Sequence, residues 1–151
     1  MAFWDQLKTK TSEMSDQLKT KSKQFTNKDF ANASMAMCAL IAAADGTIDQ
    51  TERSKTAALI MNNDILAVFS PSELREKFDF YCDRLDRDYD FGKVEAVSAI
   101  AKLKSKQDQA RAVIQIGIII GGSDGDFDAA ERQAVKEACF AVGIAPAEFD
   151  L

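Results

Sequence analysis

Two stretches of the chain nearly repeat each other. The first is Asp45-Gly46-Thr47-Ile48-Asp49-Gln50-Thr51-Glu52-Arg53, and the second is Asp124-Gly125-Asp126-Phe127-Asp128-Ala129-Ala130-Glu131-Arg132. Both read Asp-Gly-x-apolar-Asp-x-x-Glu-Arg, at a constant offset of 79 residues. Each follows an apolar run and begins a helical pattern. We interpret the pair as an internal duplication that is centred on carboxylates.

The segments around these turns predict an all-α fold. Only seven Gly and two Pro occur in 151 residues, which argues against a turn-rich β fold. The Ser70-Pro71 helix start is echoed at Ala145-Pro146, so each half reads helix, Asp-Gly turn, helix, Pro-started helix. We therefore predict a compact bundle of about seven helices, built from two pseudo-two-fold related halves. Helices are expected over about 30–44, 49–63, 91–104, 107–121 and 128–142, and from Pro71 and Pro146.

The faces of these helices carry further expectations. The helix over 30–44 is apolar nearly all round, which indicates a central, enclosed helix. We expect Asn27 or Asp29 to cap it. The helix over 91–104 is expected to present an apolar face, and the helix from Pro71 an acidic line that we interpret as a solvated face. The apolar face comprises Val94, Val97, Ile100, Ala101 and Leu103, and the acidic line comprises Asp79, Asp83, Asp86 and Asp90.

Composition excludes several kinds of site. The chain has no His, which removes Ser-His-Asp and Cys-His nucleophile systems and imidazole ligation of metals. Cys38, Cys82 and Cys139 are widely spaced in apolar settings, so we interpret them as small core residues. Any metal must then be held by oxygen, which favours Ca²⁺, Mg²⁺ or Mn²⁺, and no organic cofactor is expected. Neither a membrane-spanning run nor a signal peptide is evident, so we expect a cytoplasmic protein.

Residues 1–28 form a basic leader before an acidic body. The leader carries six Lys and a net charge of +3, whereas the remainder has a net charge of −8, which argues against nucleic-acid binding. On a helix, the apolar leader residues form a narrow stripe flanked by Lys, typical of a helix on an anionic membrane surface or in a partner groove. A solvated, partly frayed leader without a specific role is the alternative. The residues concerned are Phe3, Trp4, Leu7, Lys8, Lys10, Met14, Leu18, Lys19, Lys21 and Lys23. We predict a flexible or partly helical leader over 1–28 and one helical domain over 29–151.

The repeated turns resemble the second half of an EF-hand loop. In that motif acidic ligands precede a Gly, an apolar residue follows the Gly, and a Glu ends the loop. The first acidic ligands are missing here, so neither turn is an ordinary EF-hand. If the two turns converge, however, their carboxylates make one divalent-cation site, with Arg53 and Arg132 available to offset the repulsion. The candidate ligands are Asp45, Asp49, Glu52, Asp124, Asp128 and Glu131.

Two other interpretations of these carboxylates remain open. Asp49 with Glu52, and Asp128 with Glu131, are also what helix N-termini need for capping. Capping does not explain Asp45 and Asp124, which follow helix ends where the macrodipole disfavours an anion, although an Asx turn could explain each singly. A metal-free acidic patch that docks a basic partner is the second alternative.

These turns, each after an apolar helix, resemble those of the TerB family of tellurite-resistance proteins. The resemblance runs from about Asn27 to the C-terminus and is most specific from Ala42 to Arg53. TerB-like domains also occur in membrane-associated J-domain co-chaperones. The resemblance implies an all-helical fold and residence in the bacterial cytoplasm. It also implies action with other Ter-system proteins, including an integral membrane component, and places a cation site at the six acidic positions above.

Our leading hypothesis is a non-enzymatic tellurite- and stress-resistance module. It would bind a divalent cation through clustered carboxylates and dock with Ter-system partners at the inner face of the bacterial inner membrane, as a peripheral protein. A metal-free scaffold or adaptor domain is the alternative. A metal-assisted hydrolase or a thiol-based tellurite reductase is disfavoured, because the chain lacks His and its cysteines lack an evident activating base.

Overall fold

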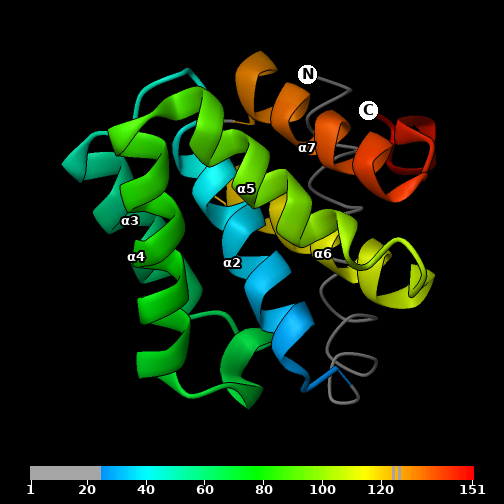
Figure 1. Cartoon of the computed structure of the whole chain (residues 1–151), viewed down its shortest axis with the longest axis horizontal. Coiled ribbons are helices and arrows are strands. Elements are labelled where there is room, and N and C mark those ends of the chain that lie inside the picture. Colours follow the sequence, from blue (N-terminus) through cyan, green and yellow to red (C-terminus); the bar gives the residue numbers. More distant parts are fainter. Residues whose placement is uncertain (1–24, 124, 126) are drawn as a thin grey trace.

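The computed structural model describes residues 25–123, 125 and 127–151. Over these residues the chain is helical and contains no strand, which confirms the all-α prediction. The segment expected as a seventh helix at Pro146 is only a short 3-10 helix, and the pseudo-two-fold relation between the halves stays a prediction. The elements are α2 (Lys28–Ala42), α3 (Gln50–Met61), η1 (Leu66–Val68), α4 (Pro71–Arg87), α5 (Tyr89–Ala101), α6 (Gln107–Gly122), α7 (Ala129–Val142) and η2 (Pro146–Phe149) (Figure 1).

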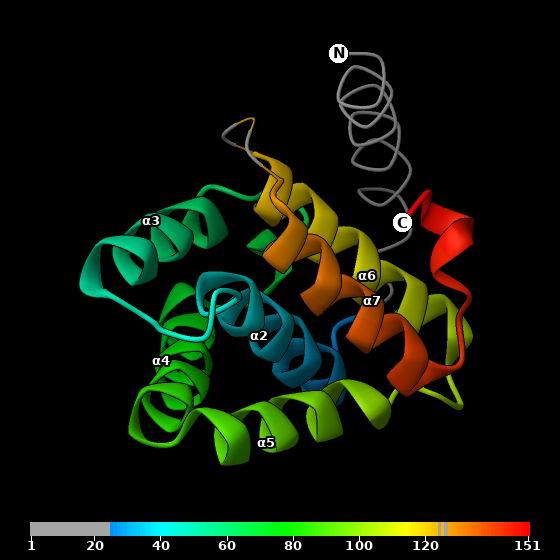
Figure 2. The same cartoon turned by 90° about the horizontal axis from the view of Figure 1, so that it is seen from above.

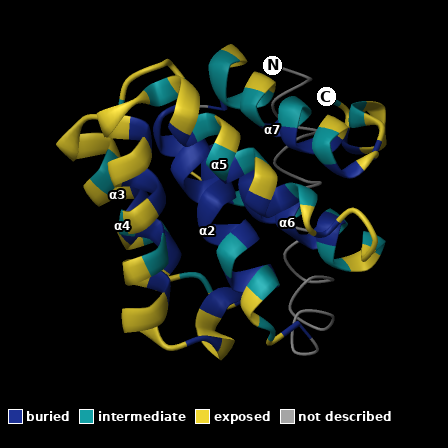
Figure 3. Cartoon of the chain, in the orientation of Figure 1, coloured by how far each residue is buried: buried dark blue, intermediate teal, exposed yellow. Residues whose placement is uncertain are grey.

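Helix α2 is the centre of the fold, as its sequence predicts. Figure 2 shows α2 between α5 on one side and the α6–α7 pair on the other, and Figure 3 shows that nearly all of it is buried. Its larger side chains, such as Phe30, Met35 and Met37, are fully enclosed. Each such side chain contributes about 1.5–3 kcal/mol through the hydrophobic effect. Asn27 caps the helix by accepting a hydrogen bond from the Phe30 N–H at 2.9 Å.

Helices α4 and α5 form a tight pair on one side of α2. Ser70 caps α4, and its hydroxyl accepts from the Glu73 N–H at 3.2 Å. Asp88 ends α4 and caps α5 by accepting from the Phe91 N–H at 3.2 Å. The two backbones approach so closely that a Cβ on Gly92 would lie 2.6 Å from the Leu85 nitrogen. This contact fixes how α5 lies across the molecule.

The structure corrects one expectation about helix faces and refines another. Val94 does not belong to the buried face of α5, since it is 63% exposed and lies near Phe91, which is 72% exposed. The interhelix contact at Gly92 rotates α5 so that these two side chains point outward. The acidic line is mostly exposed, as expected, although Asp79 and Asp83 also bind Arg53 of α3, and Asp90 lies in α5 because α4 ends at Arg87.

The β-branched run in α6 is helical and buried. Ile114, Ile116 and Ile118 are fully enclosed against neighbouring helices, so this segment closes the core beside α2. Both repeated turns lie at the ends of the two buried helices. The first follows α2 and the second follows α6, so the fold places the start of α3 and the start of α7 after core helices.

Candidate functional site

The first Asp-Gly turn reverses the chain between α2 and α3. The Gly46 N–H donates to the Ala43 carbonyl at 3.0 Å, and Gly46 has a φ of 96°, which a glycine adopts without strain. One oxygen of Asp45 accepts from the backbone N–H and the hydroxyl of Thr47, both at 3.2 Å. This is the Asx turn that the sequence leaves open, so local structure gives Asp45 one role already. Asp49 then caps α3 by accepting from the Glu52 N–H at 2.7 Å.

The second turn repeats this geometry between α6 and α7. The Gly125 N–H donates to the Gly122 carbonyl at 3.1 Å, and Gly125 has a φ of 82°. Asp128 accepts from the Glu131 N–H at 2.8 Å, and Glu131 accepts from the Asp128 N–H at 3.2 Å, which completes a capping box. The buried ring of Phe127 packs where a Cβ on Gly121 would be, which holds the turn against α6. Asp124 lies outside the described residues.

The two turns share one hollow. Asp45 and Glu52 from the first turn and Asp128 and Glu131 from the second line a space of about 140 Å³, together with Lys55. We call this hollow the acidic pocket. Four of the six candidate ligands therefore lie around one space, although Asp49 is not among the lining residues. Ile41, Ala42 and Ala44, at the end of α2, complete the lining.

The acidic side chains of this pocket are not arranged as a finished metal site. Among residues 25–123, 125 and 127–151, no three acidic or cysteine side chains are grouped closely enough to hold a metal ion. Asp45, Glu52 and Asp128 are exposed, so reorienting their carboxylates would cost no core packing, although Asp45 and Asp128 would give up their turn and capping hydrogen bonds. Oxygen ligands of this kind suit Ca²⁺, Mg²⁺ or Mn²⁺, and rearrangement of a few side chains is the step that binding would require.

Comparison with known proteins assigns the chain to a family. A family model described as "Tellurite resistance protein TerB" matches residues 31–151. The chain belongs to the TerB family. It is similar to a curated relative, "Tellurium resistance protein TerB" of Alcaligenes sp, with 28% identity over 118 residues that cover 78% of this chain and 97% of the relative. No solved structure gives a significant match. The resemblance inferred from the two turns is thus confirmed.

In this TerB-family chain, Arg53 does not neutralise the acidic pocket as the sequence suggests. Its guanidinium bridges α3 to α4, with N–O distances of 3.1 Å to Asp79 and 2.8 Å to Asp83. Burial would lower the pKa of Arg53, but its hydrogen bonds to Asp83 and Asp79 outweigh burial and raise it. Lys55 also lines the acidic pocket, on the Glu52 side of α3, although the repeated motif does not include it. Its spacing of three residues from Glu52 is the signal that could have placed it there.

The three cysteines are core residues in this TerB-family fold, as predicted. All are free and buried. Burial raises the pKa of the Cys82 thiol to about 12 and that of Cys139 to about 11, and it raises the pKa of Cys38 further. These thiols are therefore protonated at neutral pH, whereas thiol chemistry requires the thiolate.

The leader positions from Phe3 to Lys23 lie outside the described residues, so their membrane or partner role stays a prediction. Phe25, which falls within the predicted leader range of 1–28, belongs to the core and packs on Phe30 with ring centroids 5.3 Å apart. None of the described helices is long and apolar enough to cross a membrane.

Proposed function

We propose that this TerB-family protein is a non-enzymatic tellurite-resistance module that binds a divalent cation in the acidic pocket. The family supports the resistance role, since both the matching model and the relative carry that description. The observation that carries the cation proposal is the lining of one hollow by Asp45, Glu52, Asp128 and Glu131, from turns that are 79 residues apart. Docking with Ter-system partners, including an integral membrane component, belongs to the same proposal.

The chemistry of the pocket favours a hard cation. Four carboxylates offer oxygen ligands, and the open hollow leaves room for water to complete the shell. Ca²⁺ is our first choice over Mg²⁺ and Mn²⁺, because it tolerates irregular coordination that a strictly octahedral ion does not. Lys55 and the reorientation of the side chains oppose binding. We therefore expect a dissociation constant of roughly 10⁻⁴–10⁻³ M, in the range of weak calcium modules.

Titration followed by NMR tests this proposal directly. The Gly46 and Gly125 amides lie within the two turns, so addition of Ca²⁺ should shift both with one saturable curve. The variant Asp45→Asn/Glu52→Gln/Glu131→Gln should lose the response. Asn preserves the Asx turn and Gln preserves the capping box, so the variant removes charge and keeps local structure.

A matched control removes acidic charge elsewhere. Glu73 and Glu76 are exposed residues in the first turns of α4, outside the acidic pocket. The variant Glu73→Gln/Glu76→Gln should therefore bind Ca²⁺ like the parent. If no saturable shift occurs at millimolar Ca²⁺, Mg²⁺ and Mn²⁺, or if the pocket variant and the control respond alike, the cation proposal fails.

A metal-free docking role is the second candidate function. Two observations favour it: Lys55 shares the pocket with the carboxylates, and the described acidic side chains form no ready metal site. An acidic docking surface would bind a basic partner in a salt-sensitive complex, because screening weakens exposed charge pairs. The complex should survive a chelator. A complex that needs added cation would instead support the first candidate.

We include peripheral association with the inner membrane in the proposal because of the basic, amphipathic leader sequence. Co-sedimentation with anionic liposomes should compare the full chain with a form that begins at Gln24. That form keeps Phe25, which packs in the core, and every residue that follows it. Equal sedimentation of the two forms would remove the leader–membrane contact from the proposal.

A further inference from the structure

A second hollow lies directly beside the acidic pocket. It has a volume of about 270 Å³ and lies where α5 and α7 meet the end of α2. Leu40, Ala44, Tyr89, Lys93, Ala134 and Glu137 are among its lining residues. Ala44 lines both hollows, so the two are neighbours on one surface. We call the second hollow the α5–α7 groove.

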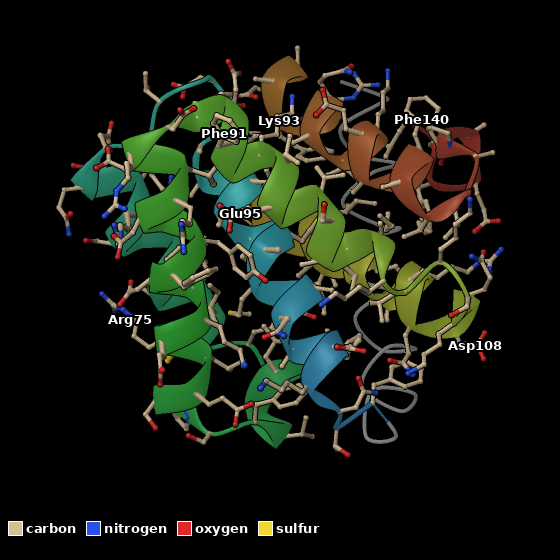
Figure 4. The ribbon with its side chains drawn as sticks, in the orientation of Figure 1. Arg75, Phe91, Lys93, Glu95, Asp108 and Phe140 are labelled. Atoms are coloured by element: carbon tan, nitrogen blue, oxygen red, sulfur yellow. The ribbon has the colours of Figure 1, made fainter. Side chains whose placement is uncertain are left out.

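The groove exists because α7 presents small side chains toward α5. Ala130 and Ala134 are one helical turn apart and both line it, so a space remains where larger residues would close the gap. At Glu137 the two helices are joined by an ion pair, with Lys93 Nζ 2.8 Å from Glu137 Oε2. Figure 4 shows Lys93 on the side of α5 that faces α7. The pair pins the two helices together and neutralises the charge of Lys93.

The size and lining of the groove select its occupant. Its volume lies at the lower edge of the ~300–1,000 Å³ of typical small-molecule sites, so its size favours a small occupant. The apolar floor of Leu40, Ala44 and Ala134 suits one or two aliphatic side chains. An apolar residue that projects from a partner's helix or extended segment is a common way to fill such a space.

The neighbouring charges select the rest of the partner. The acidic pocket contributes four carboxylates against the single ammonium of Lys55. A segment whose apolar residue fills the groove must place its adjacent residues over this negative surface. Lysine or arginine at those positions is attracted, and acidic residues are repelled.

We propose that the α5–α7 groove and the acidic pocket together bind a basic segment of a partner protein, with an apolar side chain in the groove and Lys or Arg over the carboxylates. This rests on the proposed function in one respect, because it assigns a partner to the surface around the same pocket. A divalent cation in the pocket reduces its negative charge. By linkage, cation and basic segment weaken each other's binding by the same factor.

Selection from random-sequence displayed peptides tests the proposal without prior choice of a partner. The full chain serves as bait in a chelator-containing buffer of low ionic strength. The expected peptides combine Lys or Arg with a nearby Leu, Ile, Met or Phe. Enrichment of acidic peptides, or of none, overturns the proposal.

Fluorescence anisotropy with a selected peptide then locates its site. Ala134→Phe fills the groove without a change in charge and should weaken binding roughly tenfold to a hundredfold, the worth of one buried apolar side chain. Ala147→Phe, at an exposed position in η2, is the matched control and should bind like the parent. Shifts of the Tyr89 and Lys93 amides on peptide addition map the contact in the unaltered chain. Equal affinity of the two Phe variants overturns the proposal. If Ala134→Phe is poorly folded, the amide shifts in the unaltered chain decide, and shifts outside the groove and the acidic pocket overturn the proposal.

Cation titration separates this inference from the proposed function. Ala134→Phe should bind Ca²⁺ like the parent, because its side chain lies outside the acidic pocket. If the parent binds no cation, the proposed cation site fails while the peptide result stands. If the parent binds Ca²⁺ but peptide binding is unaffected by groove filling, the groove proposal alone fails.

Discussion

Replacement of Arg53 by Met should loosen α3 from the rest of the protein. Arg53 is the main polar link between α3 and α4, with its guanidinium between Asp79 and Asp83. Helix α3 buries few of its own side chains, namely Thr56, Ala57 and Ile60. Met keeps most of the aliphatic stem, so the variant removes the charged fork and little packing.

The size of the effect follows from the exposure of the three side chains. Arg53 is 18% exposed and Asp79 is 35% exposed, so their bond is partly shielded from water and contributes about 1 kcal/mol. Asp83 is 68% exposed, which places its pair with Arg53 near the surface value of about 0.5 kcal/mol. Arg75 remains on Asp79 after the substitution and prevents a larger penalty. We expect a loss of about 1–2 kcal/mol in the free energy of unfolding.

Urea denaturation measures this loss, and hydrogen exchange shows where it acts. Arg75→Met is the control, because Arg75 is half-exposed on the outer side of α4 (Figure 4), and its ion pair among the described residues is with Asp79 on the same helix. The control should cost less than about 0.5 kcal/mol. In Arg53→Met, amides of α3 should exchange faster while those of α2 change less. Equal destabilisation by the two substitutions would refute the bridging role of Arg53.

Two further predictions concern packing and pH. Gly92→Ala should destabilise the protein by about 1–3 kcal/mol in urea denaturation, because its Cβ would meet backbone atoms of α4. This clash outweighs the better helix propensity of Ala. Ser98→Ala is the control, and a neutral or stabilising effect of Gly92→Ala relative to it would contradict the prediction. The hydrogen bond from Arg111 lowers the pKa of Glu148 below its ordinary value of 4.5, so the pair stabilises the fold above that value and the contribution is lost as pH falls through the lowered pKa. Glu148→Gln should therefore be less stable than the parent at neutral pH and equal to it in strong acid, whereas a constant difference across pH would show that the pair does not act through its charge.

The main features of the fold could be predicted because they depend on local patterns. The apolar residues on every face of α2 indicate a central helix, and Asn27, Ser70, Asp49 and Asp128 are caps that the sequence marks by residue type and spacing. The order of helices and turns follows from these signals. These signals could not show that the segment at Pro146 is a short 3-10 helix and not a seventh α-helix. Pro followed by an acidic residue is typical of the start of either kind of helix.

What could not be predicted depends on contacts between helices. The outward position of Phe91 and Val94 is set by the close approach at Gly92, which no periodicity within α5 reveals. The partners of Arg53 lie on a different helix, so the sequence could not show that it binds α4 and leaves the acidic pocket. The groove likewise arises from small residues of α7 set against α5, and Ala130 and Ala134 by themselves indicate only a helix.

The two halves of the acidic pocket are anchored unequally, and this decides which half must move if a cation binds. The α7 half is fixed by the capping box of Asp128 and Glu131 and by the buried ring of Phe127. The α3 half has the capping bond of Asp49 and the Asx turn of Asp45 but no capping box, and the Arg53 bridge helps to hold its helix against α4. Since the described carboxylates are not grouped for a metal, cation binding would require side chains to move, and we expect this movement on the α3 side, which lacks a capping box. If a cation binds in the pocket, the Arg53 bridge would oppose that movement and would couple the stability of α3 to the affinity of the pocket for the cation.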